Sequence, residues 1–251
     1  MMALLELHQV TKAYDELKVV DGFDLKVHRG ELRCLLGPNG AGKTTTIDLI
    51  TGRQKLSGGQ VSLDGTVISD WPEHMRVRAG LARKFQIPAV FKGLTVRQNL
   101  EAAFTRHLSP IRNMFVFRDR ETQDRIDEVA SLVNLKDRLR VRADELSHGE
   151  TQWLEIGMVL TQNARILLMD EPTAGMTTQE THKTGEIFNG LKGTHTLLVV
   201  EHDMSFVRQI ADRVTVMHMG RFLAEGTIQD IERNEEVQRV YLGQGGAGHH
   251  A

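Results

Sequence analysis

The sequence predicts an α/β fold that has a parallel core sheet, an antiparallel β region near the N-terminus and an inserted helical lobe. Residues 31–37, 165–171 and 195–202 each contain a short continuous apolar run, which is typical of strands buried on both faces of a parallel sheet. Helix-like segments alternate with these runs, as in α/β proteins. The 251 residues, 40% hydrophobic and 25% charged, are enough for one folded domain.

The first elements along the chain are strands. Residues 4–29 alternate short apolar runs with turns and predict an antiparallel β region. The run "ELRCLLG" at 31–37 predicts a buried strand, followed by a glycine-rich turn and a helix that ends at Gly52. The stretch "GQVSLDGTVIS" at 59–69 predicts a hairpin, because an Asp-Gly pair separates its two strand-like halves.

The character of the chain becomes helical from about Pro88 to Gly157. A helical face with i, i+3, i+4, i+7 spacing supports this: Ile126, Val129, Ala130 and Val133. Two further buried strands follow, and the chain then forms a terminal hairpin that turns at Met219–Gly220.

We therefore expect a single domain over 1–251, divided by composition. The core with its β edge comprises residues 4–86 and 158–242, the helical lobe comprises 87–157, and 243–251 form a flexible tail.

Charge and composition restrict the environment of the protein. Lys and Arg total 31 against 33 Asp and Glu, so the net charge of −2 gives no reason to expect nucleic acid as a partner. The only cysteine, Cys34, lies in an apolar run and is expected to be a buried thiol in a reducing compartment. No apolar stretch approaches the roughly 18–20 residues that span a bilayer. We expect a cytoplasmic protein, which would serve a membrane process only as a peripheral subunit.

A phosphate-binding loop is predicted at 37–45, "GPNGAGKTT", which fits the pattern G-x-x-x-x-G-K-[ST] between an apolar strand and a helix. In such a loop, backbone N–H groups and the positive helix end converge on phosphate oxygens. Lys43 would reach the β- and γ-phosphates, and the Thr44 hydroxyl would hold Mg²⁺. The alternative, a chance glycine-rich turn, does not explain the strand and helix on either side. The predicted nucleotide-binding residues here are Gly37, Pro38, Asn39, Gly40, Ala41, Gly42, Lys43, Thr44 and Thr45.

Two adjacent carboxylates follow the apolar run "RILLM" of residues 165–169. Ligands of open α/β sheets bind at the carboxyl ends of the strands, where Asp170 and Glu171 are expected. Asp170 is suited to Mg²⁺, and Glu171 is suited to orient and deprotonate an attacking water. A strand-ending acidic cap is the alternative, but it is usual for one carboxylate rather than two.

His202 and Gln86 are two further candidates for the catalytic set. His202 ends the next buried strand in "VVEHDM", where an imidazole can contact the γ-phosphate; a lone histidine is otherwise usually structural. Gln86 lies where the core gives way to the helical lobe, and its amide could join Mg²⁺ or the attacking water to that lobe. Taken alone, Gln86 would carry no information, since surface glutamines are common.

Two similar pentapeptides, "LSGGQ" at 56–60 and "LSHGE" at 146–150, raise the question of a second phosphate contact. The second precedes a helical pattern, with Ser147 as an N-cap and Glu150 completing a capping box. The first leads into a strand, and we expect Gly58 and Gly59 to form a turn there. The chemistry of an anion-binding helix start therefore favours residues 146–150.

The phosphate loop, the glutamine, "LSxG", "LLMDEP" and "EHD", in this order over roughly residues 4–242, resemble the ATP-binding subunits of ABC transporters. The resemblance implies a P-loop (RecA-like) core and a head-to-tail dimer. In that dimer Ser147 and Gly149 would contact the ATP held by the partner's phosphate loop. Tyr14 matches the aromatic residue that stacks on adenine in the family.

This chain departs from the family pattern at three positions. His148 replaces a glycine and Glu150 replaces a glutamine, while Thr177 stands where the family usually has an aspartate after "DEP". We expect Ser147 and Gly149 to keep their roles. Communication between the two active sites of a dimer is expected to differ where the aspartate is missing.

Within the family, "RKFQIPAVF", "LSHGE" and "AGMT" resemble the hydrophobic amino acid and amide importer group, most of all the ATP-binding subunits of urea importers. The resemblance implies ATP and Mg²⁺ as cofactors and a place on the inner face of the cell membrane. The implied partners are integral membrane permease subunits, a second homologous ATPase subunit or a second copy of this chain, and indirectly a solute-binding protein. "NMFVF" at 113–117 would contact the permease or form the core of the lobe. The cargo would be urea or a short-chain amide; the alternative is a branched-chain amino acid.

Other function classes fit less well. ABC proteins outside transport usually carry two nucleotide units or a long coiled insertion, and a GTPase would need an N-K-x-D motif, which the sequence lacks. A nucleotide-binding scaffold without turnover would not need Glu171 and His202.

Overall fold

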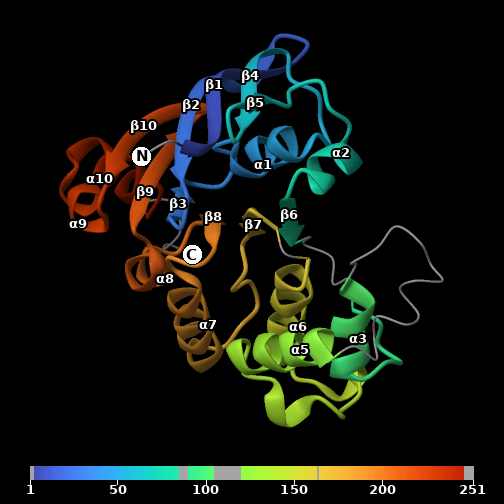
Figure 1. Ribbon diagram of the computed structural model, residues 1–251. Helices are drawn as coiled ribbons and strands as arrows, with labels where there is room; N and C mark the ends of the chain where they lie inside the picture. The colour runs from blue at the N-terminus through green and yellow to red at the C-terminus, as the bar shows by residue number, and fades with distance from the viewer. Residues whose placement is uncertain (1–2, 85–89, 105–119, 163, 246–251) are drawn as a thin grey trace.

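The computed structural model describes residues 3–84, 90–104, 120–162 and 164–245 and contains two β-sheets with helices packed around them (Figure 1). The first sheet is antiparallel, with the order β2-β1-β4-β5. Its strands are β1 Ala3–Tyr14, β2 Leu17–His28, β4 Gly58–Leu63 and β5 Thr66–Val67. The Asp64–Gly65 turn between β4 and β5 has positive φ at both residues, which confirms the hairpin expected from the Asp-Gly pair.

The second sheet has the order β10-β9-β3-β8-β7-β6, and all its neighbours are parallel except β9 and β10. Its strands are β3 Leu32–Leu36, β6 Leu81–Lys84, β7 Ile166–Asp170, β8 Thr196–Glu201, β9 Arg213–His218 and β10 Arg221–Gly226. The apolar runs predicted as buried parallel strands are β3, β7 and β8, and the predicted terminal hairpin is β9–β10. The α/β class is therefore confirmed.

The helices fall into groups that Figure 1 separates. Helices α3, α5 and α6 lie together away from the antiparallel sheet, whereas α1 and α2 lie beside it. Their bounds, with those of the C-terminal helices, are α1 Lys43–Thr51, α2 Glu73–Arg78, α3 Val96–Ala103, α5 Arg120–Leu132, α6 His148–Leu160, α7 Thr178–Leu191, α8 Met204–Ile210, α9 Ile228–Arg233 and α10 Glu235–Gly245. Helices α9 and α10 were not anticipated from the sequence, and α10 extends into the predicted tail.

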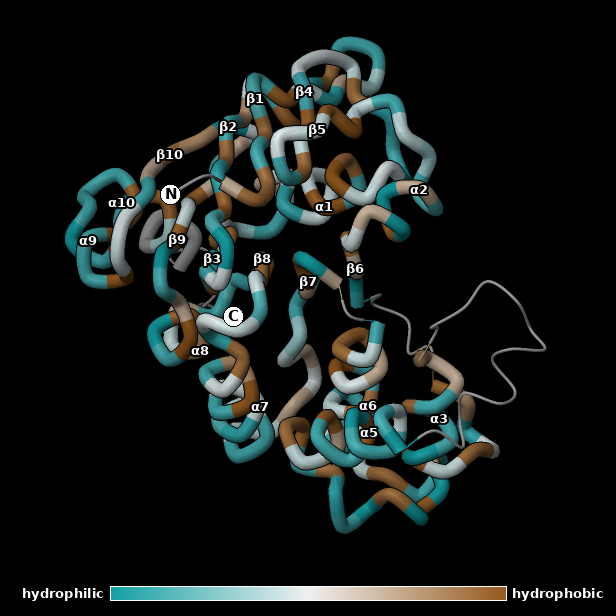
Figure 2. Tube along the Cα trace, viewed as in Figure 1, coloured by the Kyte–Doolittle hydropathy of each residue, from teal (hydrophilic) through white to brown (hydrophobic). Residues whose placement is uncertain are grey.

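The parallel sheet separates two hydrophobic cores, because alternate residues of one strand face opposite sides. In β8, Leu197 and Val199 belong to the core against the helices, while Leu198 and Val200 belong to the core against the antiparallel sheet. Figure 2 shows hydrophobic and hydrophilic residues interspersed along the trace. Because the strands are buried on both faces, their carboxyl ends are held in place, and the candidate site lies at these ends.

One charged residue lies inside a predicted apolar strand. Arg33 of β3 is 1% exposed, and its guanidinium contacts Glu31 at 2.7 Å and Glu225 at 2.6 Å. The strand therefore tolerates a buried cation because two carboxylates accompany it.

A second buried ion pair joins the parallel sheet to helix α6. Lys84 Nζ at the end of β6 lies 3.3 Å from Glu155 Oε2, and both side chains are 5% exposed. Burial lowers the pKa of Lys84, and the charge of Glu155 opposes this shift. The contact fixes α6 against the sheet edge beside the carboxyl end of β7.

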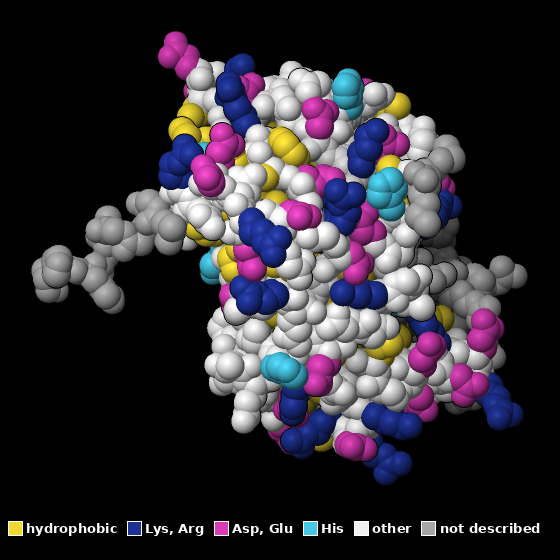
Figure 3. Space-filling view, turned by 90° about the vertical axis from the view of Figure 1, so that its left-hand side faces the viewer, with side chains coloured by type: hydrophobic (Ala, Val, Ile, Leu, Met, Phe, Trp, Pro, Cys, Tyr) yellow, Lys and Arg dark blue, Asp and Glu magenta, His cyan; other side chains and the backbone are white. Residues whose placement is uncertain are grey.

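On the face in Figure 3, acidic and basic side chains are interspersed. Such a surface carries alternating charge rather than a field of one sign.

Candidate functional site

The predicted phosphate loop connects β3 to the start of α1. Gly42 is the N-cap of α1 with φ of +100°, and a Cβ there would lie 2.6 Å from the Val19 carbonyl oxygen. Both observations require glycine. The next residue, Lys43, donates hydrogen bonds from Nζ to the carbonyl oxygens of Gly37 at 2.6 Å and Pro38 at 3.0 Å. The Lys43 side chain thus folds back over its own loop.

Asp170 and Glu171 stand at the carboxyl end of β7, and β8 separates this strand from β3. The two carboxylates and Glu201 are close enough to raise the pKa of Lys43, against the larger lowering by burial. The structure therefore gathers the phosphate-loop lysine and the predicted carboxylates at one edge of the sheet. This is the edge where open α/β sheets bind ligands.

Glu171 has an unusual backbone conformation. Its φ of +46° lies in the left-handed region that few residues other than glycine adopt, and its N–H donates to the Val200 carbonyl at 3.0 Å. The carboxylate lies 3.3 Å from His202 Nδ1, and 32% of the Glu171 side chain is exposed. The two predicted catalytic side chains are thus in contact, and both reach solvent.

Asp170 is buried more deeply than its neighbour, and one of its oxygens is available. Arg83 Nη2 contacts Asp170 Oδ2 at 3.3 Å, whereas buried Asp170 Oδ1 has no hydrogen-bond partner among the described residues. Burial raises the pKa of Asp170, and Arg83 opposes this. The exposed Thr44 hydroxyl is close enough to hydrogen-bond Asp170 and so oppose the rise in its pKa; together, this hydroxyl and the carboxylate fit the oxygen ligands that Mg²⁺ prefers. Thr44 and Asp170 are the described residues that would hold the ion.

Sequence reasoning missed Arg83, which lies in β6 only three residues before Gln86. Its side chain is 5% exposed and bridges Asp170 to Asp48 of α1. From Asp48 the contacts continue to Gln54, whose amide nitrogen lies 3.1 Å away, and then to the Tyr14 hydroxyl. A charged residue at the end of a buried strand was the available signal, since such a cation needs carboxylate partners.

Glu201 was also missed, although it precedes His202 in the same motif. It is 1% exposed at the end of β8 and accepts a hydrogen bond from the Thr173 hydroxyl at 2.9 Å. Burial raises its pKa. Its position fixes the loop after Glu171 against β8.

Tyr14 lies at the end of β1 with 46% of its surface exposed. Lys12 Nζ sits 4.8 Å from the ring centroid. The exposed aromatic ring is compatible with the predicted stacking on adenine, which stays a prediction.

The start of α6 carries the second predicted phosphate contact. Ser147 is the N-cap, and the reciprocal bonds with Glu150 form the capping box that the sequence predicted. Ser147 is exposed, while the amide of Gly149 donates to Glu180 Oε1 at 3.1 Å. Figure 1 separates α6 from α1, so one chain does not bring these residues to its own phosphate loop. Ser147 is exposed to a different chain, whereas Gly149 is buried and its amide is held by Glu180.

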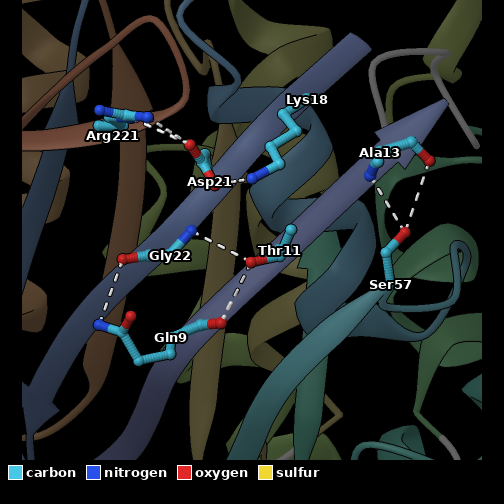
Figure 4. A network of polar contacts seen from close by, with 8 residues as sticks. All are labelled: Gln9, Thr11, Ala13, Lys18, Asp21, Gly22, Ser57 and Arg221. Atoms are coloured by element: carbon cyan, nitrogen blue, oxygen red, sulfur yellow. Dashed lines mark hydrogen bonds and ion pairs between the residues drawn. The ribbon is translucent and has the colours of Figure 1, made fainter. Parts of the chain in front are cut away.

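The other pentapeptide, at residues 56–60, has a different role. Gly58 and Gly59 lie in β4 rather than in the turn predicted for them, and Gly59 has φ of +80° with a Cβ position 2.2 Å from the Gln9 carbonyl oxygen. Ser57 accepts a hydrogen bond from the Ala13 amide of β1 at 3.0 Å (Figure 4). Gly59 permits close approach of two strands at a register shift, so the turn prediction is corrected.

Two predictions lie outside the described residues. Gln86 belongs to 85–89, and "NMFVF" belongs to 105–119. Within the described part of the chain, none of the helices combines the length and apolar character that crossing a membrane requires.

The chain is similar to known proteins along nearly its whole length. A family model described as ABC transporter matches residues 20–174. The branched-chain amino acid transport ATP-binding protein BraF of Pseudomonas aeruginosa is 36% identical over 250 residues, which cover 96% of this chain and 98% of BraF. LivG of Escherichia coli K12, a protein of the same description, is 33% identical with the same coverage. The ADP conformation of MJ1267, an ATP-binding cassette of an ABC transporter, superposes with a TM-score of 0.83 at 28% identity over 97% of this chain and all of that one.

Proposed function

The chain belongs to the ABC transporter family as an ATP-hydrolysing subunit, and from this premise we propose that it energises import of branched-chain amino acids through separate membrane subunits. The single observation that supports branched-chain amino acids as the cargo is the likeness to BraF and LivG along nearly the whole chain. This supports the alternative that the sequence left open rather than urea. A place at the inner face of the membrane follows from a permease partner.

Urea import stays the second candidate. It rests on "RKFQIPAVF", "LSHGE" and "AGMT", the stretches that resemble the urea branch of the group. The two cargoes cannot be separated by the catalytic geometry, since both branches share it.

The proposed reaction follows from the contacts at the sheet edge. A water oxygen attacks the γ-phosphorus of ATP, the bond from that phosphorus to the ADP oxygen breaks, and Glu171 accepts the proton of the water. His202, 3.3 Å from Glu171, orients the carboxylate, and Lys43 leaves the carbonyls of its own loop to contact the phosphates. When bound, Mg²⁺ supplies positive charge that neutralises the phosphate oxygens.

The proposed assembly is a head-to-tail pair of ATPase subunits. Ser147 and Gly149 of each subunit would contact the ATP on the phosphate loop of the other. The separation of α6 from α1 supports this arrangement, because a single chain offers each ATP either the phosphate loop or the start of α6, but not both. The second subunit is a homologous chain or a second copy of this one.

Uptake measurements decide the cargo. Source cells that lack this chain are compared with cells that carry the wild-type chain again, using labelled leucine and labelled urea in parallel. We expect the chain to restore leucine uptake alone. Restoration of urea uptake alone would favour the urea candidate, and restoration of neither would contradict import of both cargoes while leaving the ATPase assignment intact.

A further inference from the structure

Helices α6 and α7 begin beside each other and share one carboxylate. Glu180 Oε2 accepts hydrogen bonds from the backbone amide and the hydroxyl of Thr177, both at 2.9 Å, and so completes the capping box of α7. Glu180 Oε1 accepts from the Gly149 amide at 3.1 Å and from the Ser147 hydroxyl at 3.3 Å. These four residues, Ser147, Gly149, Thr177 and Glu180, are called the Glu180 bridge below.

The Glu180 bridge gives the Gly149 amide a hydrogen-bond acceptor that helix α6 does not supply. At the start of α6, Ser147 caps the amide of Glu150, so the Gly149 amide needs an acceptor from elsewhere. The carboxylate packs closely on Gly149: a Cβ there would lie 2.4 Å from Glu180 Oε1, so a larger residue would displace the Glu180 side chain. Hydrogen bonds from Thr177, Gly149 and Ser147 lower the pKa of Glu180, which is therefore a carboxylate at neutral pH.

Two of the three departures from the family pattern lie where the start of α6 meets the loop from β7 to α7 and the start of α7. Thr177 is the N-cap that Glu180 holds. His148 Nε2 lies 3.1 Å from the Ala174 carbonyl oxygen, in the loop between β7 and α7. Both residues therefore help to join the start of α6 to the segment that follows Glu171.

We propose that Glu180 competes with ATP for the start of α6: its carboxylate occupies the Ser147 hydroxyl and the Gly149 amide until the γ-phosphate of ATP on the partner's phosphate loop displaces it. This inference rests on the head-to-tail assembly proposed above. A carboxylate and a phosphate cannot share the same two donors, because their negative charges repel and each donor has one proton to give. Closure of the dimer must therefore release Glu180 from Ser147 and Gly149, while its other oxygen can keep the α7 cap.

The test compares Glu180→Gln with Asp230→Asn in a Glu171→Gln background that slows hydrolysis. Asp230 is a matched control, since it caps α9 through the backbone amide of Thr227 at 2.9 Å and the Thr227 hydroxyl at 2.7 Å, in the same pattern. Association of the chain in ATP and Mg²⁺ is measured by analytical ultracentrifugation. We expect Glu180→Gln to lower the dissociation constant of the dimer about tenfold, because the competing charge is gone, and Asp230→Asn to leave it unchanged. Equal or weaker association of Glu180→Gln overturns the competition.

A second measurement tests the Glu180 bridge whether or not the chain forms a dimer with itself. Hydrogen exchange of the Gly149 amide is followed without nucleotide in wild type, Glu180→Ala and Asp230→Ala. We expect exchange about tenfold faster or more in Glu180→Ala alone. Unchanged exchange there contradicts the bridge. Absence of ATP-dependent association in every variant would instead count against self-pairing, and failure to restore uptake would count against the proposed cargo.

Discussion

Glu171 and His202 form the residue pair on which the proposed chemistry depends, at 3.3 Å between carboxylate and imidazole. Glu171→Gln keeps the shape of the side chain but removes its basicity, so we expect ATP binding to persist and turnover to fall by about 10²–10⁴-fold. Nucleotide binding and phosphate release are measured on the same preparation. Glu186→Gln is the control, because Glu186 also faces a histidine, His182 at 3.6 Å, on an exposed helix face. Turnover of Glu171→Gln within a few-fold of wild type would show that Glu171 is not the general base.

Arg83 contacts one oxygen of Asp170, and we propose that this contact orients the other oxygen toward Mg²⁺. Residues that orient metal ligands typically change metal affinity by about 10–100-fold when substituted. We therefore expect Arg83→Gln to raise the Mg²⁺ concentration for half-maximal turnover in that range, with partial rescue by Arg83→Lys.

Nucleotide binding in EDTA separates a loss of metal affinity in Arg83→Gln from a general loss of nucleotide binding. A positioning role leaves metal-independent binding near the wild-type value. An unchanged Mg²⁺ requirement, or equal losses with and without the metal, would contradict the assignment of Arg83 to Asp170.

At the scale of single elements, the start of α6 combines a cap with a proposed phosphate contact. Ser147→Ala and Thr227→Ala each remove the N-cap of a capping box, at α6 and α9 respectively. Each should lower the free energy of unfolding by about 1 kcal/mol. Only Ser147→Ala should also lower turnover in the assembled transporter. Equal turnover in the two variants would mean that Ser147 serves α6 alone.

The same helix shows how far local chemistry predicts structure. The capping box at Ser147 and Glu150 could be predicted because its donors and acceptors lie within four residues. The contact of Gly149 with Glu180 could not, since it joins residues 31 positions apart. The turn predicted at Gly58 and Gly59 was wrong for a related reason. A glycine pair predicts a turn locally, but here Gly59 allows β4 to approach β1.

Strands β3, β7 and β8 were predictable because burial on both faces leaves continuous apolar runs, and these runs fixed the edge where Lys43, Asp170, Glu171 and His202 meet. Arg83 and Glu201 escaped prediction, as their roles depend on strand order, which one sequence does not reveal. Helices α9 and α10 were missed because their apolar residues are few within short segments.

At the scale of the whole molecule, the proposed assembly divides each ATP site between two subunits: the phosphate loop and the carboxylates at the sheet would come from one, and the start of α6, which Figure 1 shows apart from α1, from the other. A second subunit is then needed to complete each site, and the permease would be driven by closing and opening of the pair. This account requires the hydrolysis at Glu171 to be coupled to transport.

Leucine uptake by source cells that carry either the wild-type chain or Glu171→Gln tests this claim most directly, with Glu186→Gln as the control. The account predicts loss of uptake in Glu171→Gln cells and normal uptake in Glu186→Gln cells, at equal amounts of each chain. Normal leucine uptake with Glu171→Gln, in cells whose uptake depends on the wild-type chain, would contradict it.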